Sequence, residues 1–192
     1  MQLSYATTNQ GKVKSLELAL SPFSIPVVQA QIDLEEPRSD SVYRIARSKL
    51  LQAREVVQGP LVVLDAAFCI KALNDFPNTF IHHALSTIGV EGLLRLTEGK
   101  DRSCEFVHAI AYADQYMTAG AMFFFYTERG KVADVPRSGG SFKWSELWKI
   151  FIPEGSDKTL AEFTEDEIAK REQGFYKPFG EWLSARAKRY EL

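Results

Sequence analysis

Leu3-Ser4-Tyr5-Ala6-Thr7-Thr8-Asn9-Gln10-Gly11-Lys12 is the stretch from which the architecture of the chain is best read. A short apolar run at 3–6 leads into a polar turn, and the apolar residues of 12–20 then recur at helical spacing. This order predicts a strand, a tight turn and a helix, which is the opening unit of an α/β sheet.

The rest of the chain also alternates between strand and helix patterns. The apolar run 61–64 is typical of a strand buried on both faces, and it ends at Asp65. A hairpin turn is predicted at 128–131, between antiparallel strands. The remaining expected elements are strands at 26–30, 104–112, 119–126 and 132–135, a helix at 40–58 with Ser39 or Asp40 as its N-cap, and helices at 80–88, at 90–96 and over most of the C-terminal part.

Composition favours one soluble domain. The 192 residues are 45% hydrophobic, which is enough for one full core, so we expect a single domain over 1–192. The net charge of -2 offers no overall field for nucleic acid or an anionic membrane, and no apolar run reaches the roughly 18 residues of a membrane span. Cys69 and Cys104 lie in separate apolar runs, which favours buried free thiols and a cytoplasmic protein.

The turn at 7–12 is the first candidate functional site. Backbone N–H groups at a helix start carry partial positive charge, Gly11 lets the chain approach a ligand closely, and Lys12 adds a full charge. A phosphate group would fit there. On local sequence alone, an equally good interpretation is that Thr8 or Asn9 simply caps the helix.

Two further spots carry possible chemistry. Asp65 could hold Mg²⁺ against phosphate oxygens or take a proton from water, or it could merely cap the element that follows. In 138–144, aromatic rings beside glycines could stack on a nucleobase. The alternative is that Phe142, Trp144 and Trp148 are core residues.

Taken in order, several blocks of the chain resemble the inosine triphosphate pyrophosphatase family. Members of this family hydrolyse purine nucleoside triphosphates with non-standard bases to the monophosphate and pyrophosphate. The resemblance spans nearly the whole chain. The blocks are 7–12 (similar to T-G-N-x-x-K), 58–65 (G-P-V-x-V-E-D), 72–77 (A-L-G-G-x-P-G), 136–144 (P-R-G and then G-F-G-W) and 151–162 (F-x-P-x-G-x-x-x-T-x-A-E).

The resemblance implies an α/β fold with an elongated mixed β-sheet flanked by helices in two lobes, a central cleft for the nucleotide, and a homodimer. It also implies a Mg²⁺-dependent hydrolase in which Asp65 and Lys12 are catalytic and Asp65 and Asp40 bind the metal. Phe142 and Trp144 would flank the base. The residues implied for substrate binding are Thr7, Thr8, Asn9, Gln10, Gly11, Lys12, His82, Phe142, Lys143, Trp144, Ser145, Lys170 and Arg171.

The chain departs from the family pattern at several of these positions. The family's second acidic metal ligand aligns with Ser41, which leaves Asp40 or Glu36 as substitutes. Ser145 stands where the family has a base-reading Asp, and 168–174 lacks the family's K-N-x-x-S-H-R block. Two hypotheses therefore stay open: a pyrophosphatase with altered or reduced activity, or a nucleotide-binding homologue without useful catalysis.

Overall fold

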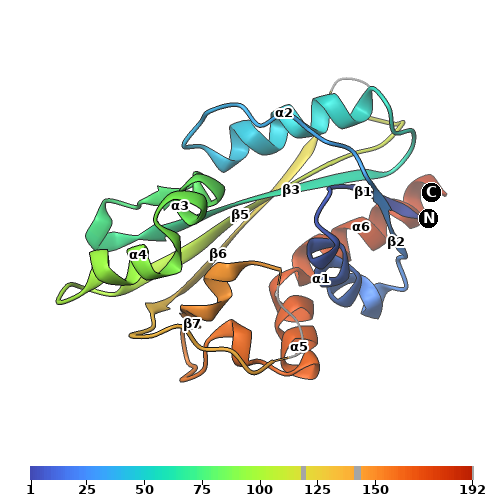
Figure 1. Cartoon of the computed structure of the whole chain (residues 1–192). Coiled ribbons are helices and arrows are strands. Elements are labelled where there is room, and N and C mark those ends of the chain that lie inside the picture. Colours follow the sequence, from blue (N-terminus) through green and yellow to red (C-terminus); the bar gives the residue numbers. More distant parts are fainter. Residues whose placement is uncertain (118–119, 141–143, 192) are drawn as a thin grey trace.

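The strands of the molecule cross it as one long sheet with helices on both faces (Figure 1). The structure is a computed structural model and describes residues 1–117, 120–140 and 144–191. Seven strands of this described part form the sheet, in the order β2-β1-β3-β5-β6-β7 with β4 paired to β3. The strands are β1 (Leu3–Ala6), β2 (Val27–Ala30), β3 (Leu61–Ile70), β4 (Pro77–Asn78), β5 (Ser103–Ala113), β6 (Met122–Val132) and β7 (Phe151–Pro153).

Helices and short 3₁₀ turns connect and cover these strands. The α-helices are α1 (Gln10–Leu20), α2 (Val42–Arg54), α3 (Ile81–Thr87), α4 (Gly89–Thr97), α5 (Glu165–Phe175) and α6 (Lys177–Tyr190). The 3₁₀ turns are η1 (Ser21–Phe23), η2 (Lys71–Leu73), η3 (Glu146–Lys149) and η4 (Leu160–Glu162). None of the described helices has both the length and the apolar character needed to cross a membrane.

The sheet is mixed, as the predicted fold class requires. β1 pairs in parallel with β2 and with β3, whereas β5 pairs antiparallel with β3 on one side and with β6 on the other. The parallel pairs are joined through α1 and α2, because a parallel connection needs a crossover. The expected elongated α/β sheet is therefore confirmed.

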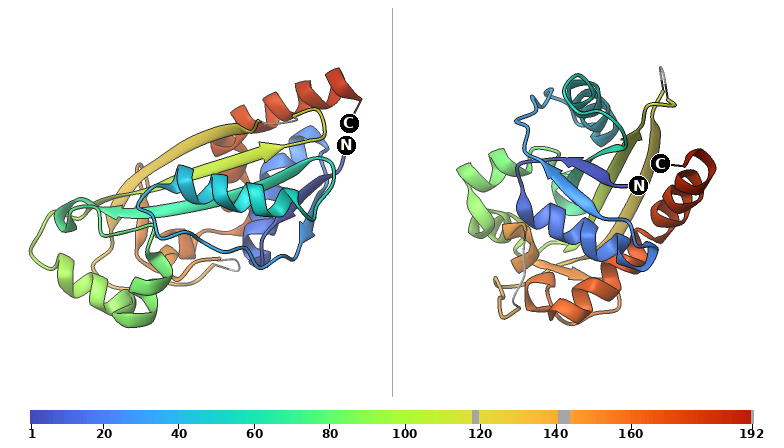
Figure 2. Two further views of the ribbon diagram at one scale, coloured as in Figure 1. Left: turned by 90° about the horizontal axis from the view of Figure 1, so that it is seen from above. Right: turned by 90° about the vertical axis from the view of Figure 1, so that its right-hand side faces the viewer.

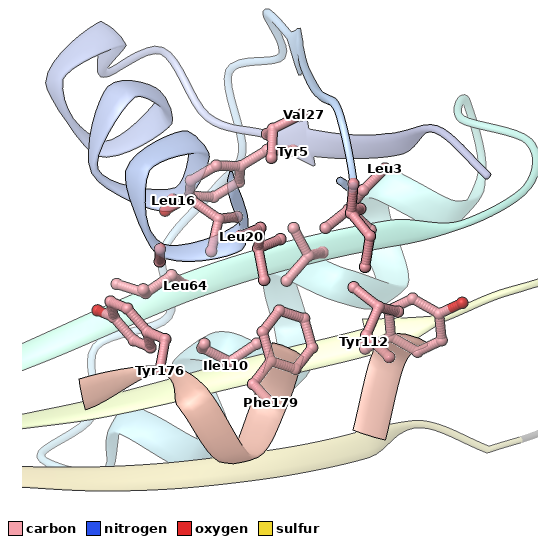
Figure 3. Packing of buried hydrophobic residues seen from close by; sticks show 14 of the residues in the cluster. Leu3, Tyr5, Leu16, Leu20, Val27, Leu64, Ile110, Tyr112, Tyr176 and Phe179 are labelled. Carbon is pink, nitrogen blue, oxygen red and sulfur yellow. The ribbon is translucent and has the colours of Figure 1, made fainter. Parts of the chain in front are cut away.

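Separate apolar clusters attach helices to the two faces. On one face, Leu50 and Ala53 of α2 pack on Val63 and Ala111 of the central strands. On the other face, α1 and α6 share a second cluster with β1, β3 and β5, and Figure 3 shows its members converging from helix and sheet. The labelled members of that cluster are Leu3, Tyr5, Leu16, Leu20, Val27, Leu64, Ile110, Tyr112, Tyr176 and Phe179.

The two ends of the long strands carry different helices, which gives the expected two lobes. In the views of Figures 1 and 2, α3 and α4 gather at one end, while α1, α6 and both termini lie at the other. A third apolar cluster fills the far end, where Leu93 of α4 and Trp148 of η3 pack with Phe106 and Phe151. Residues between these lobes are therefore candidates for the cleft.

Two predicted strand ends are wrong. β3 does not end at Asp65, because 66–70 continue to pair with β5. β6 runs unbroken through 128–131, so neither the hairpin turn nor a separate strand at 132–135 exists. A Cβ on Gly130 would lie 2.2 Å from the carbonyl oxygen of Ile152, so this glycine permits close pairing with β7 instead of a turn.

Two other boundaries also differ from the sequence expectation. The helix expected at 40–58 begins after Ser41, whose hydroxyl oxygen accepts a hydrogen bond from the N–H of Arg44, so neither Ser39 nor Asp40 is its N-cap. The sequence does not predict β7, because its three residues are too few to show a period. Residue 119, the predicted start of a strand, lies outside the described residues.

Asp114 and Arg186 tie α6 to the end of β5. The Asp114 carboxylate is fully buried and accepts hydrogen bonds from Arg186 Nε at 2.5 Å, from Arg186 Nη2 at 2.9 Å and from the Tyr112 hydroxyl at 2.8 Å. Burial raises the pKa of Asp114, but these hydrogen bonds lower it more, and the pKa lies below its ordinary value. Asp114 is therefore ionised in the folded protein at neutral pH.

Arg186→Met should lower the free energy of unfolding by about 3–5 kcal/mol, because it leaves the Asp114 carboxylate buried without its cation. Equilibrium urea unfolding measures this change. Lys188→Met is the matched control, since Lys188 is exposed on the same helix and should change stability by less than about 0.5 kcal/mol. Equal losses in the two variants would contradict a structural role for the pair.

Candidate active site

The turn between β1 and α1 is held by its own side chains. Asn9 is the N-cap of α1, and its Oδ1 accepts a hydrogen bond from the N–H of Lys12 at 3.2 Å. The N–H of Asn9 donates to Thr7 Oγ1 at 3.1 Å, and Asn9 Nδ2 donates to the carbonyl oxygen of Trp144 at 3.4 Å. The capping interpretation of Asn9 is thus confirmed, and the same residue fastens the loop to the opposite wall.

Gly11 is needed where the loop meets Trp144. A Cβ built on Gly11 would lie 2.3 Å from the Cβ of Trp144 and 3.1 Å from its Cα. Contacts this short force the backbone of one segment away from the other. The glycine therefore allows the turn and the segment at 144 to approach closely.

Gly11→Ala is expected to lower the free energy of unfolding by about 1–3 kcal/mol, because the new methyl group displaces Trp144. Urea unfolding of the variant checks this. Gly174→Ala in α5 is the control: a Cβ added at Gly174 would meet nothing within 4 Å, so alanine should stabilise that helix by roughly 0.5–1 kcal/mol. Changes of the same sign in both variants would contradict the close approach at Gly11.

Asp65 lies in the middle of β3, beside the point where β1 ends and the chain turns into α1. Its side chain is 8% exposed, and Oδ1 accepts a hydrogen bond from Lys49 Nζ at 2.7 Å. Lys49 Nζ also lies 2.5 Å from Glu36 Oε1. Burial lowers the pKa of Lys49, but these two carboxylates raise it more, and the pKa lies above its ordinary value.

Sequence reasoning assigns Lys49 no functional role. The residue falls on the apolar stripe of α2, between Ile45, Ala46 and Ala53, and the helical pattern groups it with core residues. A lysine on the buried face of a helix is itself a signal, because a buried ammonium needs a carboxylate partner. The fold supplies Asp65 from β3 and Glu36 from the segment that precedes α2.

Lys12 and Asp65 line one cavity of about 360 Å³ between the two lobes. The resemblance implies a central cleft for the nucleotide and roles for both residues in it, and the structure brings Lys12 and Asp65 to the same cavity. The cavity is lined by Asn9, Lys12, Glu36, Asp65, Ala66, Thr79, Ile81, His82, Leu85, Trp144, Ser145 and Glu146.

Lys12 is the cation of this cavity without a carboxylate in direct contact, as far as the described residues show. Its Nζ lies 5.4 Å from the centre of the Trp144 ring. Burial lowers the pKa of Lys12, and Lys49 lowers it too, although Asp65 and Glu36 act in the opposite direction. An anionic ligand that entered the cavity would therefore gain a partly desolvated ammonium.

The structure brings some predicted residues to this cavity and leaves others away from it. Asn9, Lys12, Asp65, His82, Trp144 and Ser145 line it. Thr8 and Gln10 are exposed and outside the lining, and so are Asp40 and Lys170. Glu36, the other substitute that the sequence offers for the second acidic ligand, pairs with Lys49, which in turn contacts Asp65. Phe142 and Lys143 lie outside the described residues.

Arg171 is turned into the interior instead of the cavity. Its Nε donates to Glu128 Oε1 at 2.7 Å, its other nitrogens contact Glu128 and Glu172, and its side chain is 12% exposed. The guanidinium also lies over the rings of Trp148 and Phe175. In this arrangement the charge of Arg171 is neutralised within the fold, so a substrate contact would require it to leave both carboxylates.

Comparisons with known proteins agree with this geometry. The model of the Ham1 family matches residues 3–176. The dITP/XTP pyrophosphatase of Thermococcus kodakarensis is 33% identical over 98% of this chain and 100% of its own length, and that of Methanopyrus kandleri is 35% identical over 88% of each chain. Among solved structures, the Ham1 protein of Staphylococcus aureus is similar with a TM-score of 0.74 at 21% identity, covering 97% of this chain and 100% of its own.

Proposed function

The chain belongs to the Ham1 family, and from that premise we propose that it is a nucleoside triphosphate pyrophosphohydrolase acting on purine triphosphates with non-standard bases. Relatives that match nearly the whole chain are named dITP/XTP pyrophosphatases, which supports this activity. The single observation that carries the proposal is the cavity shared by Lys12 and Asp65, since phosphoryl transfer needs cations for the phosphates and a base for the water.

The proposed reaction breaks the bond between the α-phosphorus and the oxygen that bridges it to the β-phosphorus. A water oxygen attacks the α-phosphorus, pyrophosphate leaves with the bridging oxygen, and the nucleoside monophosphate remains. Asp65 accepts the proton from the attacking water. Lys12 and the N-terminal end of α1 bind the negative charge of the phosphate chain.

Mg²⁺ is proposed as the cofactor because the carboxylates of the cavity fit it. Proteins commonly hold Mg²⁺ through one or two carboxylates, while waters and substrate phosphates complete its shell. Asp65 and Glu36 would hold the ion, and within the described residues no group of three His, Cys, Asp or Glu side chains offers a fuller cage. When bound, the ion would neutralise charge on the phosphates.

Other parts of the sequence prediction also remain proposals. Trp144 and Ser145 would lie near the base, and His82 near the phosphate chain. A homodimer and a cytoplasmic location stay predictions as well.

The test measures pyrophosphate and monophosphate release from ITP, XTP, dITP, ATP and GTP, each with and without Mg²⁺. We expect release from the triphosphates with non-standard bases, and loss of release when EDTA removes the metal. Pyrophosphate must appear in equal amount to the monophosphate, because stepwise phosphate release would indicate a phosphatase. Ligand-induced thermal stabilisation without turnover of any substrate would instead support a nucleotide-binding homologue.

A further inference from the structure

The Lys49 ammonium lies between the two carboxylates that are proposed to hold the metal. It is 2.7 Å from Asp65 Oδ1 and 2.5 Å from Glu36 Oε1. The Lys49 and Asp65 side chains are 10% and 8% exposed, whereas Glu36 is 57% exposed. Glu36 is therefore the movable member of the group, and Asp65 is the fixed one.

A cation is required at this place whether or not a metal is present. Among the residues that the structure describes, Lys49 is the cation in contact with the buried Asp65 carboxylate, and without it Asp65 and Glu36 would be two neighbouring like charges. A divalent ion bound by both carboxylates supplies the same compensation. Lys49 contacts one oxygen of each carboxylate, so an ion bound by both carboxylates would lie beside the ammonium. The two cations would repel each other and therefore compete for the carboxylates.

The segment that carries Glu36 is fastened to the same face of α2. Gln52, three residues after Lys49, accepts a hydrogen bond from the N–H of Glu35 at 2.9 Å and donates one to the carbonyl oxygen of Glu35 at 2.8 Å. Residues three apart on a helix are neighbours on its surface. The backbone next to Glu36 is thus held in place independently of Lys49, which allows the carboxylate to exchange one cation for another.

We propose that Lys49 acts as an internal substitute for the divalent cation: it holds Asp65 and Glu36 together and is displaced from them when the metal binds. The identity of the metal rests on the proposed function, but the competition itself does not. A consequence is that the metal alone binds weakly and gains affinity when a triphosphate adds its own oxygen ligands. Lys49 is a positioning residue in this proposal.

The test is isothermal titration calorimetry of Mn²⁺, without nucleotide, into the wild-type chain, Lys49→Met, Lys49→Arg and Arg47→Met. We expect Lys49→Met to lower the Mn²⁺ dissociation constant by about tenfold or more, because a competing unit charge is removed from the carboxylates. Lys49→Arg should stay near the wild-type value. Arg47→Met is the matched control, since Arg47 is exposed on the same helix, and its dissociation constant should change by less than about twofold.

An unchanged or larger dissociation constant in Lys49→Met would overturn the proposal, because it would mean that Lys49 assists metal binding. An equal decrease in the Mn²⁺ dissociation constant of Arg47→Met would also overturn it, because the effect would then come from the overall charge of α2. Since no nucleotide is present, these results do not depend on hydrolysis. If the chain had no pyrophosphatase activity but Lys49→Met still bound Mn²⁺ more tightly, the proposed function would be wrong and the competition would stand.

Two further measurements keep the proposal testable if Lys49→Met folds poorly. Thermal unfolding of Lys49→Met should show a lower Tm than the wild type without metal and a larger rise in Tm on addition of Mn²⁺. Glu36→Gln removes the exposed carboxylate and should fold normally, yet raise the Mn²⁺ dissociation constant by about tenfold or more. A Glu36→Gln chain that bound Mn²⁺ as the wild type does would refute the shared site.

Discussion

Asp65→Asn is expected to lower kcat/KM for pyrophosphate release by about a thousandfold. The variant keeps the volume of the side chain but loses the charge that would accept the proton of the attacking water and bind the metal. Steady-state pyrophosphate release from the best substrate of the panel measures the effect. Urea unfolding of the same variant shows whether the fold is intact.

Asp134→Asn serves as the control for this loss. The Asp134 side chain is 82% exposed just beyond the end of β6, where it pairs with Arg102, and it lies outside the cavity. Its kcat/KM should stay within about twofold of the wild type. If Asp65→Asn retained wild-type turnover, the assignment of Asp65 as the base would fail together with the proposed mechanism.

The opening unit of the fold could be predicted because its information is local. The apolar run of β1, the Asn9 cap and the helical spacing of α1 all lie within 3–20, and each follows from neighbouring residues. The relation between Lys12 and Asp65 is expected from the family resemblance, because it depends on the pairing of strands that lie far apart in the sequence. A parallel pairing of β1 and β3 brings the end of β1 beside Asp65, even though β3 itself continues to Ile70.

The partners of the charged residues could not be predicted, because they depend on tertiary pairing. Lys49 occupies a core position in the helical pattern, and only the fold places Asp65 and Glu36 against it. Arg171 is expected from the sequence to contact substrate, but it is buried against Glu128. The resemblance implies the substrate role of Arg171 from its place in the family pattern, whereas its partner Glu128 lies on β6, far away in the sequence, and is brought to it only by the fold.

Lys49 and Arg171 pair with carboxylates, whereas Lys12 contacts none among the described residues. Lys12→Met is therefore expected to change activity and stability in different ways. Activity is expected to fall by about a hundredfold to a thousandfold in kcat/KM, because one preorganised cation is lost from the phosphate chain. Stability is expected to stay unchanged or rise. Burial lowers the pKa of Lys12 in the fold, which means that the charged side chain is less favourable there than in the unfolded chain. At pH values below the folded pKa, removing the charge therefore removes a free-energy cost of folding.

Lys14→Met separates this effect from a general loss of charge on α1. The Lys14 side chain is 44% exposed on the same helix and pairs with Glu165 at 2.5 Å, so its loss should change kcat/KM by less than about twofold. Pyrophosphate release measures kcat/KM of both variants, and urea unfolding measures their free energies of unfolding. A Lys12→Met chain destabilised by more than about 1 kcal/mol, with activity lost in proportion, would show that Lys12 supports the fold. High activity with intact stability would remove it from the phosphate site.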